Sequence, residues 1–134
     1  MSHINSIHHI NYVVKDLSPH ITYLEKVLGC KPITEGLEGR NVKTARFPIG
    51  DAWIVLVQPL SEEGEVARIL AERGEGLFLL SLGVDNLDSS LSKLAQQGVQ
   101  PDSKGPRKGL DTWLIQDLDC PLGLASVLQL CQNA

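Results

Sequence analysis

An internal repeat constrains the fold of this chain more than any other feature of its sequence. Residues 7–17 (IHHINYVVKDL) align with residues 77–87 (LFLLSLGVDNL), so the same apolar pattern recurs at a separation of 70 positions. Each segment reads as a strand and precedes a helical apolar stripe that stops at a glycine, Gly29 in the first half and Gly98 in the second. A repeat of this kind fixes the architecture before any single strand is assigned.

The two halves continue in the same way after their helices. Ser18 and Pro19 are expected to open the first helix, and Asp85 or Asn86 to cap the second. Strand-like runs then follow at 42–47 and 53–58, and again at 112–116 and 126–131. Each half therefore reads β-α-β-β-β. We expect one domain over 1–134, with module one at about 5–60, a linking helix at 61–74 and module two at about 75–132.

Composition excludes several classes of function. The chain has 12 Lys and Arg against 16 Asp and Glu, so its net charge is −4 and the basic footprint of nucleic-acid binding is missing. The longest apolar runs, at 53–57 and 77–80, are far shorter than a membrane span. The three cysteines show no CxxC spacing, which favours reduced thiols in a cytoplasmic protein. We expect no partner among nucleic acids or membranes.

Three stretches resemble the vicinal oxygen chelate superfamily, which includes glyoxalase I, bleomycin-resistance proteins, extradiol dioxygenases and methylmalonyl-CoA epimerase. They are residues 7–17, residues 50–60 (GDAWIVLVQPL) and residues 74–87 (GEGLFLLSLGVDNL), and their order and spacing are similar to the epimerase branch. The resemblance implies an α+β fold in which two tandem β-α-β-β-β modules form paired curved sheets, or half-barrels, around a cavity. It also implies a homodimer.

The resemblance also implies a divalent metal site, in which the first and the fourth strand of each module supply one ligand each. These positions fall on His9, Val55, Leu79 and Gln129, with Val127 left open as an alternative to Gln129. Valine and leucine offer no ligand atom, whereas even a catalytic zinc takes three protein ligands. We therefore expect no metal and no other cofactor. The epimerase base would fall near residue 39, which is glycine here, with Glu38 one residue away.

Residues in phase with His9 are expected to face the cavity, because side chains alternate along a strand. This phase predicts His9 as the candidate catalytic residue and a set of ligand-binding residues, namely Asn11, Trp53, Val55, Leu79, Ser81 and Gln129. A mostly apolar surface with a few polar groups is typical of a site for a small organic ligand. A structural role for His9, and a core or dimer contact for Trp53, stay open as alternatives.

Three functions compete at this point. The first is a metal-independent small-molecule-binding protein of the bleomycin-resistance kind, which needs no catalytic group. The second is an enzyme of the epimerase or lyase type, acting next to the carbonyl of an acyl-CoA or 2-oxo compound, with His9 as general base. The third is a degenerate domain kept as an interaction partner. The aliphatic residues at two metal positions favour the first.

Overall fold

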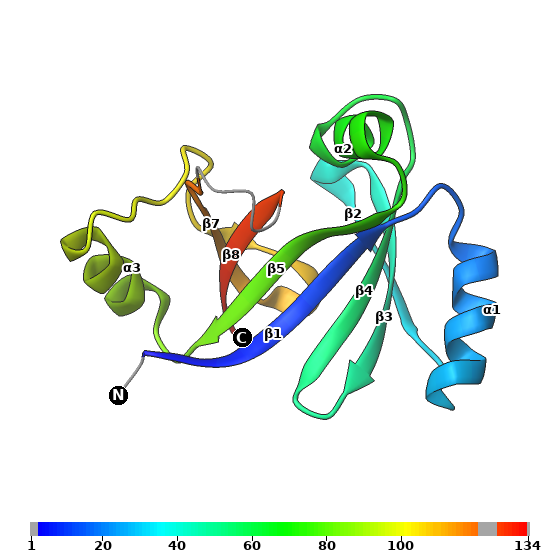
Figure 1. The fold of residues 1–134 in the computed structure, drawn as a ribbon, viewed down its shortest axis with the longest axis horizontal. Helices are drawn as coiled ribbons and strands as arrows, with labels where there is room; N and C mark the ends of the chain where they lie inside the picture. The colour runs from blue at the N-terminus through cyan, green and yellow to red at the C-terminus, as the bar shows by residue number, and fades with distance from the viewer. Residues whose placement is uncertain (1–2, 121–125, 134) are drawn as a thin grey trace. The chain divides into compact units, whose positions relative to one another are not determined.

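The computed structural model describes residues 3–120 and 126–133, and it alternates strands and helices in the repeated order (Figure 1). The elements are β1 (Ile4–Val13), α1 (Leu17–Leu28), β2 (Ile33–Leu37), the 3₁₀ turn η1 (Glu38–Arg40), β3 (Val42–Ile49), β4 (Ala52–Pro59), α2 (Glu65–Arg73), β5 (Gly76–Val84), α3 (Leu87–Gln96), β6 (Arg107–Lys108), η2 (Leu110–Thr112), β7 (Leu114–Leu118) and β8 (Val127–Gln132). The α+β class and the two β-α-β-β-β modules are confirmed. Helix α2 lies within the segment predicted to link them.

The helix ends show where local chemistry departs from the prediction. Helix α1 begins at Leu17, because the Asp16 side chain accepts a hydrogen bond from the backbone N–H of Ser18 at 3.1 Å. The cap is therefore Asp16 and not the Ser18–Pro19 pair. Asn86 caps α3 as predicted, with its side chain accepting from the backbone N–H of Ser89 at 2.8 Å.

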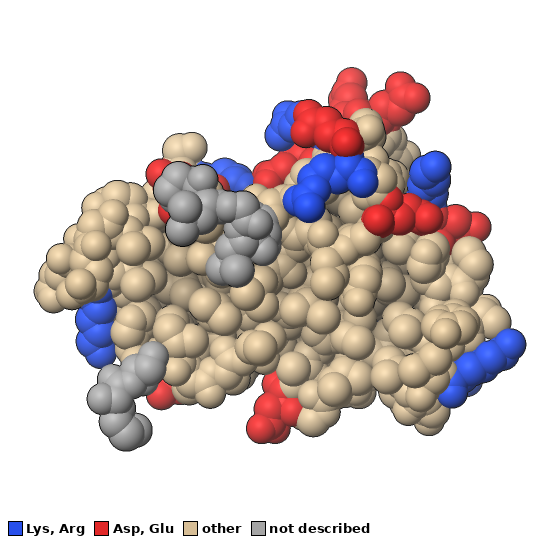
Figure 2. All heavy atoms as spheres, viewed as in Figure 1, with Lys and Arg blue, Asp and Glu red and all other residues tan. Residues whose placement is uncertain are grey.

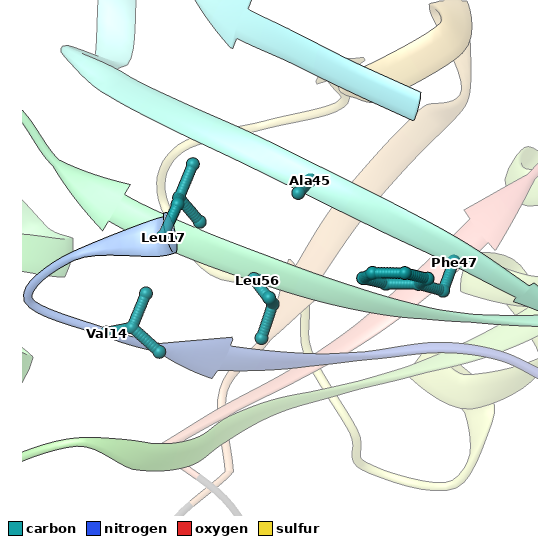
Figure 3. Packing of buried hydrophobic residues seen from close by; sticks show 5 residues of the cluster. All are labelled: Val14, Leu17, Ala45, Phe47 and Leu56. Carbon is teal, nitrogen blue, oxygen red and sulfur yellow. The ribbon is translucent and has the colours of Figure 1, made fainter. Parts of the chain in front are cut away.

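The chain packs as two compact units, and strands β1 and β5 contribute to both. The α1 unit comprises residues 10–78, and its strands lie in the order β2-β3-β4-β1. Helix α1 covers one face of this sheet (Figure 1). Figure 3 shows the apolar side chains buried between them: Val14, Leu17, Ala45, Phe47 and Leu56. Leu56 of β4 faces the helix, and because side chains alternate along a strand, its neighbour Val55 lies on the opposite face.

The α3 unit comprises the chain up to residue 9 and from residue 79 onward, and its strands lie in the order β1-β5-β8-β7-β6. Its core lies under α3 and is formed by Val84, Leu87, Leu118 and Leu130. Because Leu130 faces α3, its neighbours in β8 at positions 129 and 131 face the other side of the sheet. That second face carries the polar side chains described below.

Charged side chains of both signs surround α2 on the face shown in Figure 2. The helix carries Glu65, Arg68, Glu72 and Arg73 within its nine residues. Opposite charges this close together offset each other's field at the surface. In the described part of the chain, no helix is long and apolar enough to cross a membrane.

Candidate functional site

A chain of buried polar groups crosses the sheet face of the α3 unit that lies opposite α3. The Ser81 hydroxyl donates to Gln129 Oε1 at 2.9 Å, and Gln129 Nε2 donates to Asp117 Oδ1 at 2.9 Å. The exposed fractions of Ser81, Gln129 and Asp117 are 0%, 2% and 3%. Buried polar groups persist when each has a partner, and both ends of the Gln129 amide have one.

Two cations complete this network from the segment that precedes β7. Lys104 Nζ lies 2.7 Å from Asp117 Oδ2, and Arg107 Nη2 lies 2.9 Å from the same oxygen. Burial alone would raise the pKa of Asp117, but hydrogen bonds from Lys104 and Gln129, together with the charges of Arg107 and Lys104, lower it overall. Asp117 is therefore a carboxylate at neutral pH, with its charge compensated inside the protein.

A second cluster on this face joins the two histidines of β1 to Trp113. The His8 and His9 Nδ1 atoms are 2.9 Å apart, and the His9 ring stacks on the Trp113 ring with 4.9 Å between centroids. Trp113 also meets the edge of His8 at 4.6 Å. Burial and the neighbouring His8 lower the pKa of His9 to about 3. His9 is therefore neutral over the physiological range.

Trp113 is held against the histidines by a turn of unusual backbone conformation. Asp111 and Thr112 have φ angles of 47° and 58°, in the left-handed region that few residues other than glycine adopt. A β-branched residue such as threonine is strained there, and such strain concentrates at functional sites. The turn directs the next side chain, Trp113, into the buried cluster, where it is 4% exposed.

Three of the predicted ligand-binding residues lie in the α1 unit instead. Trp53 receives the guanidinium of Arg46 over its ring, 5.4 Å from the centroid, and Arg46 pairs with Glu35 at 2.6 Å. Val55 is fully buried. Asn11 Oδ1 is buried and has no hydrogen-bond partner in the described structure. The roles of Asn11 and Trp53 as ligand contacts stay predictions.

The structure brings His9, Ser81 and Gln129 together on one face of the α3 unit, as their shared phase predicted. The main residues missed were Asp117, His8 and Trp113. Asp117 lies one residue beyond the strand predicted at 112–116, whereas the observed strand β7 extends to Leu118 and so includes it. His8 was assigned to the helix face, but its ring contacts His9 and Trp113.

Two equivalent hydrogen bonds show which residue of β8 corresponds to Val55. The backbone N–H of Leu17 donates to Gln58 Oε1 in the α1 unit, and the backbone N–H of Leu87, 70 positions later, donates to Gln132 Oε1 in the α3 unit. Gln58 and Gln132 are thus equivalent. Three positions earlier, Val55 corresponds to Gln129 and not to Val127.

The four family metal positions do not fit a metal ion. Val55 and Leu79 have no donor atom, and Gln129 Oε1 already accepts from Ser81. Of the four residues, His9 alone retains a nitrogen, Nε2, without a hydrogen bond in the described structure. One ligand falls short of the three protein ligands of a catalytic zinc site and of the larger oxygen set of Mg²⁺.

Another group of potential ligands does come together, namely His8, His9 and Cys131, with one ligand atom from each within 4.8 Å of the others. Cysteine binds metals as the thiolate, but burial raises the pKa of Cys131 to about 12. The contact between the two histidines also occupies both Nδ1 atoms. As arranged, this group is a hydrogen-bonded histidine pair beside a protonated thiol.

An open hollow of about 520 Å³ lies in the α1 unit beside η1, near the position at which the epimerase base was expected. Its lining residues are Gly36, Leu37, Gly39, Asn41, Val42 and Leu60. None of these six side chains is titratable. The lining therefore offers no replacement for a catalytic carboxylate.

The family model described as "Glyoxalase/Bleomycin resistance protein/Dioxygenase superfamily" matches residues 8–115. This chain belongs to that superfamily. Among solved structures, methylmalonyl-CoA epimerase from Mycobacterium tuberculosis is 25% identical, with a TM-score of 0.90 over 100% of this chain and 91% of the epimerase. Hypothetical protein BH1468 from Bacillus halodurans C-125 is 26% identical, with a TM-score of 0.87 over 96% of this chain and 94% of that protein.

One curated protein is also similar in sequence. Uncharacterized protein YqjC of Bacillus subtilis (strain 168) is 29% identical over 107 residues, which are 79% of this chain and 76% of YqjC. Both the superfamily and the likeness to epimerase structures agree with the resemblance found in the sequence. A function of the glyoxalase superfamily type follows from this membership.

Proposed function

We propose that this protein binds a small organic molecule without a metal ion, in the manner of the bleomycin-resistance branch of its superfamily. The observation that carries the proposal is the state of the four metal positions. Val55 and Leu79 are aliphatic, and both ends of the Gln129 side chain are hydrogen-bonded within the protein. A family site altered in this way keeps its shape but no longer holds the metal ion that would act as a Lewis acid.

The predicted contacts divide into two roles under this proposal. In the α3 unit, His9 offers a flat ring to the ligand. In the α1 unit, Asn11 Oδ1 has no partner in the described residues and Trp53 offers a flat ring, so these two are the candidate contacts there. Val55 and Leu79 supply apolar surface. Ser81 and Gln129 bond to each other and so hold the floor of the site in shape.

The alternative is an epimerase or lyase with His9 as general base. The similarity to methylmalonyl-CoA epimerase is the reason to keep it. A general base works best when its pKa is close to the working pH, whereas the pKa of His9 is lowered to about 3. This mismatch makes the enzyme the second choice.

Native mass spectrometry of protein purified without added metal tests the proposal. We expect a non-covalent organic adduct that is released on unfolding, and a weaker adduct in His9→Leu than in the control His20→Gln on α1. A bare chain in every preparation, with no binding across a library of aromatic and acyl compounds, would contradict it. For the alternative, the α-hydrogen of methylmalonyl-CoA in deuterium oxide should exchange no faster with the protein than in buffer alone. Exchange that depends on His9 would establish the enzyme instead.

A homodimer, a cytoplasmic location and a single folding domain stay predictions from the sequence. Light scattering during size-exclusion chromatography measures the first directly, with an expected mass of twice the 14.6 kDa chain. A monomer at micromolar concentration would refute the dimer.

A further inference from the structure

Three side chains of the α3 unit form a continuous hydrogen-bonded series. Asn133 Oδ1 lies 2.8 Å from His8 Nε2, and His8 Nδ1 lies 2.9 Å from His9 Nδ1. Both histidines are at least 95% buried, and Trp113 contacts both rings. The series therefore has a fixed geometry and ends at His9.

The carbonyl oxygen of Asn133 determines which atom donates and which accepts in each hydrogen bond of the series. An amide carbonyl oxygen only accepts, so His8 Nε2 carries a proton and donates to Asn133. In neutral imidazole the other nitrogen is then an acceptor, so His8 Nδ1 accepts a hydrogen bond from His9 Nδ1–H. The His9 Nε2 atom is consequently left as a bare acceptor.

This acceptor has no partner among the described residues. His9 is 4% exposed, and its only hydrogen bond is the one to His8. The Nε2 atom itself is not among the fully enclosed polar atoms that lack a partner, so a group from outside the chain can reach it and donate a hydrogen bond to it. A molecule with an O–H or N–H group supplies that match, whereas a molecule that offers only acceptors does not.

We infer that His8 and Asn133 are positioning residues that fix His9 as a hydrogen-bond acceptor through Nε2, and that the ligand of this protein presents an O–H or N–H donor to it. The inference rests on the proposed function for its ligand and deepens it by naming the ligand class. The tautomer of His9 can be measured in the ligand-free protein, so the inference and the proposed function are tested separately.

Long-range ¹H–¹⁵N spectra at pH 8 test the positioning role, since an ordinary histidine is neutral there. We expect the proton of His9 on Nδ1 and that of His8 on Nε2. His8→Leu keeps the site apolar and packed, and it should move the His9 proton to Nε2. His8→Asn returns an acceptor near the position of Nδ1 and should restore the original tautomer, while the control His20→Gln changes neither. A wild-type His9 protonated on Nε2 overturns the inference even if the variants fail to fold.

Phenol and anisole (methoxybenzene) test the ligand class, because they share a ring and differ in the O–H donor. We expect phenol to bind about threefold to tenfold more tightly, which corresponds to one hydrogen bond. The preference should disappear in His8→Leu and return in His8→Asn. Equal affinities, or no binding of either at millimolar concentration, overturn the donor class, and a wild-type spectrum with His9 Nδ1–H still supports the positioning role.

Discussion

Ser81 and Gln129 are opposite neighbours on β5 and β8, and the Ser81 hydroxyl donates a 2.9 Å hydrogen bond to the Gln129 side chain. Gln129 stands where the family resemblance places the last metal ligand. Its other end binds Asp117 at 2.9 Å. Both ends of the Gln129 side chain are thus hydrogen-bonded within the protein. Removing either hydrogen bond should lower the free energy of unfolding.

Ser81→Ala should lower the free energy of unfolding by about 1–3 kcal/mol, because it leaves the buried Gln129 Oε1 without a donor. Urea denaturation of Ser81→Ala, Gln129→Met and the double variant gives the coupling between them, which we expect to reach about 1 kcal/mol. Ser92→Ala on the exposed side of α3 serves as control and should change stability by less than about 0.5 kcal/mol. Additive effects of the two core substitutions would show that the hydrogen bond contributes nothing.

Asp117→Asn should destabilise the protein by about 2 kcal/mol at pH 7. Breaking a buried ion pair usually costs more, but Lys104 and Arg107 are 37% and 25% exposed, so water replaces part of the lost interaction. Because folding lowers the pKa of Asp117, its contribution is complete above the unfolded value of about 3.9 and is lost as the pH falls through the folded value. The stability difference from wild type should therefore shrink in acid. A constant difference from pH 7 to pH 3 would contradict this account, and Asp51→Asn in an exposed turn is the control.

His9→Leu should weaken the pH dependence of stability, in a pH range above the one in which Asp117 acts. The folded pKa of His9 is about 3 and the unfolded value about 6.5, so only the unfolded chain takes up the proton between them. Stability should fall as the pH drops below about 6.5, by up to about 1.4 kcal/mol per pH unit. Urea midpoints at pH 7.5 and pH 5 measure the loss, which should reach about 2 kcal/mol for wild type and His20→Gln and be smaller in His9→Leu. Equal losses in all three proteins would show that His9 titrates normally.

Thr112→Asn should raise the free energy of unfolding by about 0.5–1 kcal/mol. Asparagine tolerates the left-handed region better than a β-branched residue, and Thr112 has a φ angle of 58°. Thr22→Asn in the middle of α1 is the matched control and should be neutral or slightly destabilising. Thermal unfolding distinguishes them. A loss of stability at position 112 would mean that the threonine side chain makes a contact that outweighs the strain.

The sequence predicted the fold because the repeat and the alternation of apolar residues report directly on burial. Leu130 and Leu56 had to face a helix, and that placed their neighbours Gln129 and Val55 on the opposite faces of their sheets. Helix starts were less predictable, since Asp16 and Ser18 are both good caps and only the hydrogen bond distinguishes them.

The candidate site was only partly predictable, for a physical reason. Alternation assigns a residue to a face, but it does not say which side chains on that face bond to each other. Asp117 looked like one acid among 16, and its role depends on Gln129 and two cations that come from elsewhere in the chain. The backbone conformation of the preceding turn determines the direction of the Trp113 side chain, and a pattern of apolar residues does not predict that conformation.

This protein is proposed to bind its organic ligand without a metal ion. Retention of the ligand when a chelator is added tests this most directly. Protein expressed in medium supplemented with Zn, Mn and Co is analysed by elemental analysis and native mass spectrometry before and after excess EDTA. The account predicts far less than one metal ion per chain and an organic adduct of equal abundance in both samples. About one metal ion per chain, with the adduct lost when EDTA removes the metal, would contradict it.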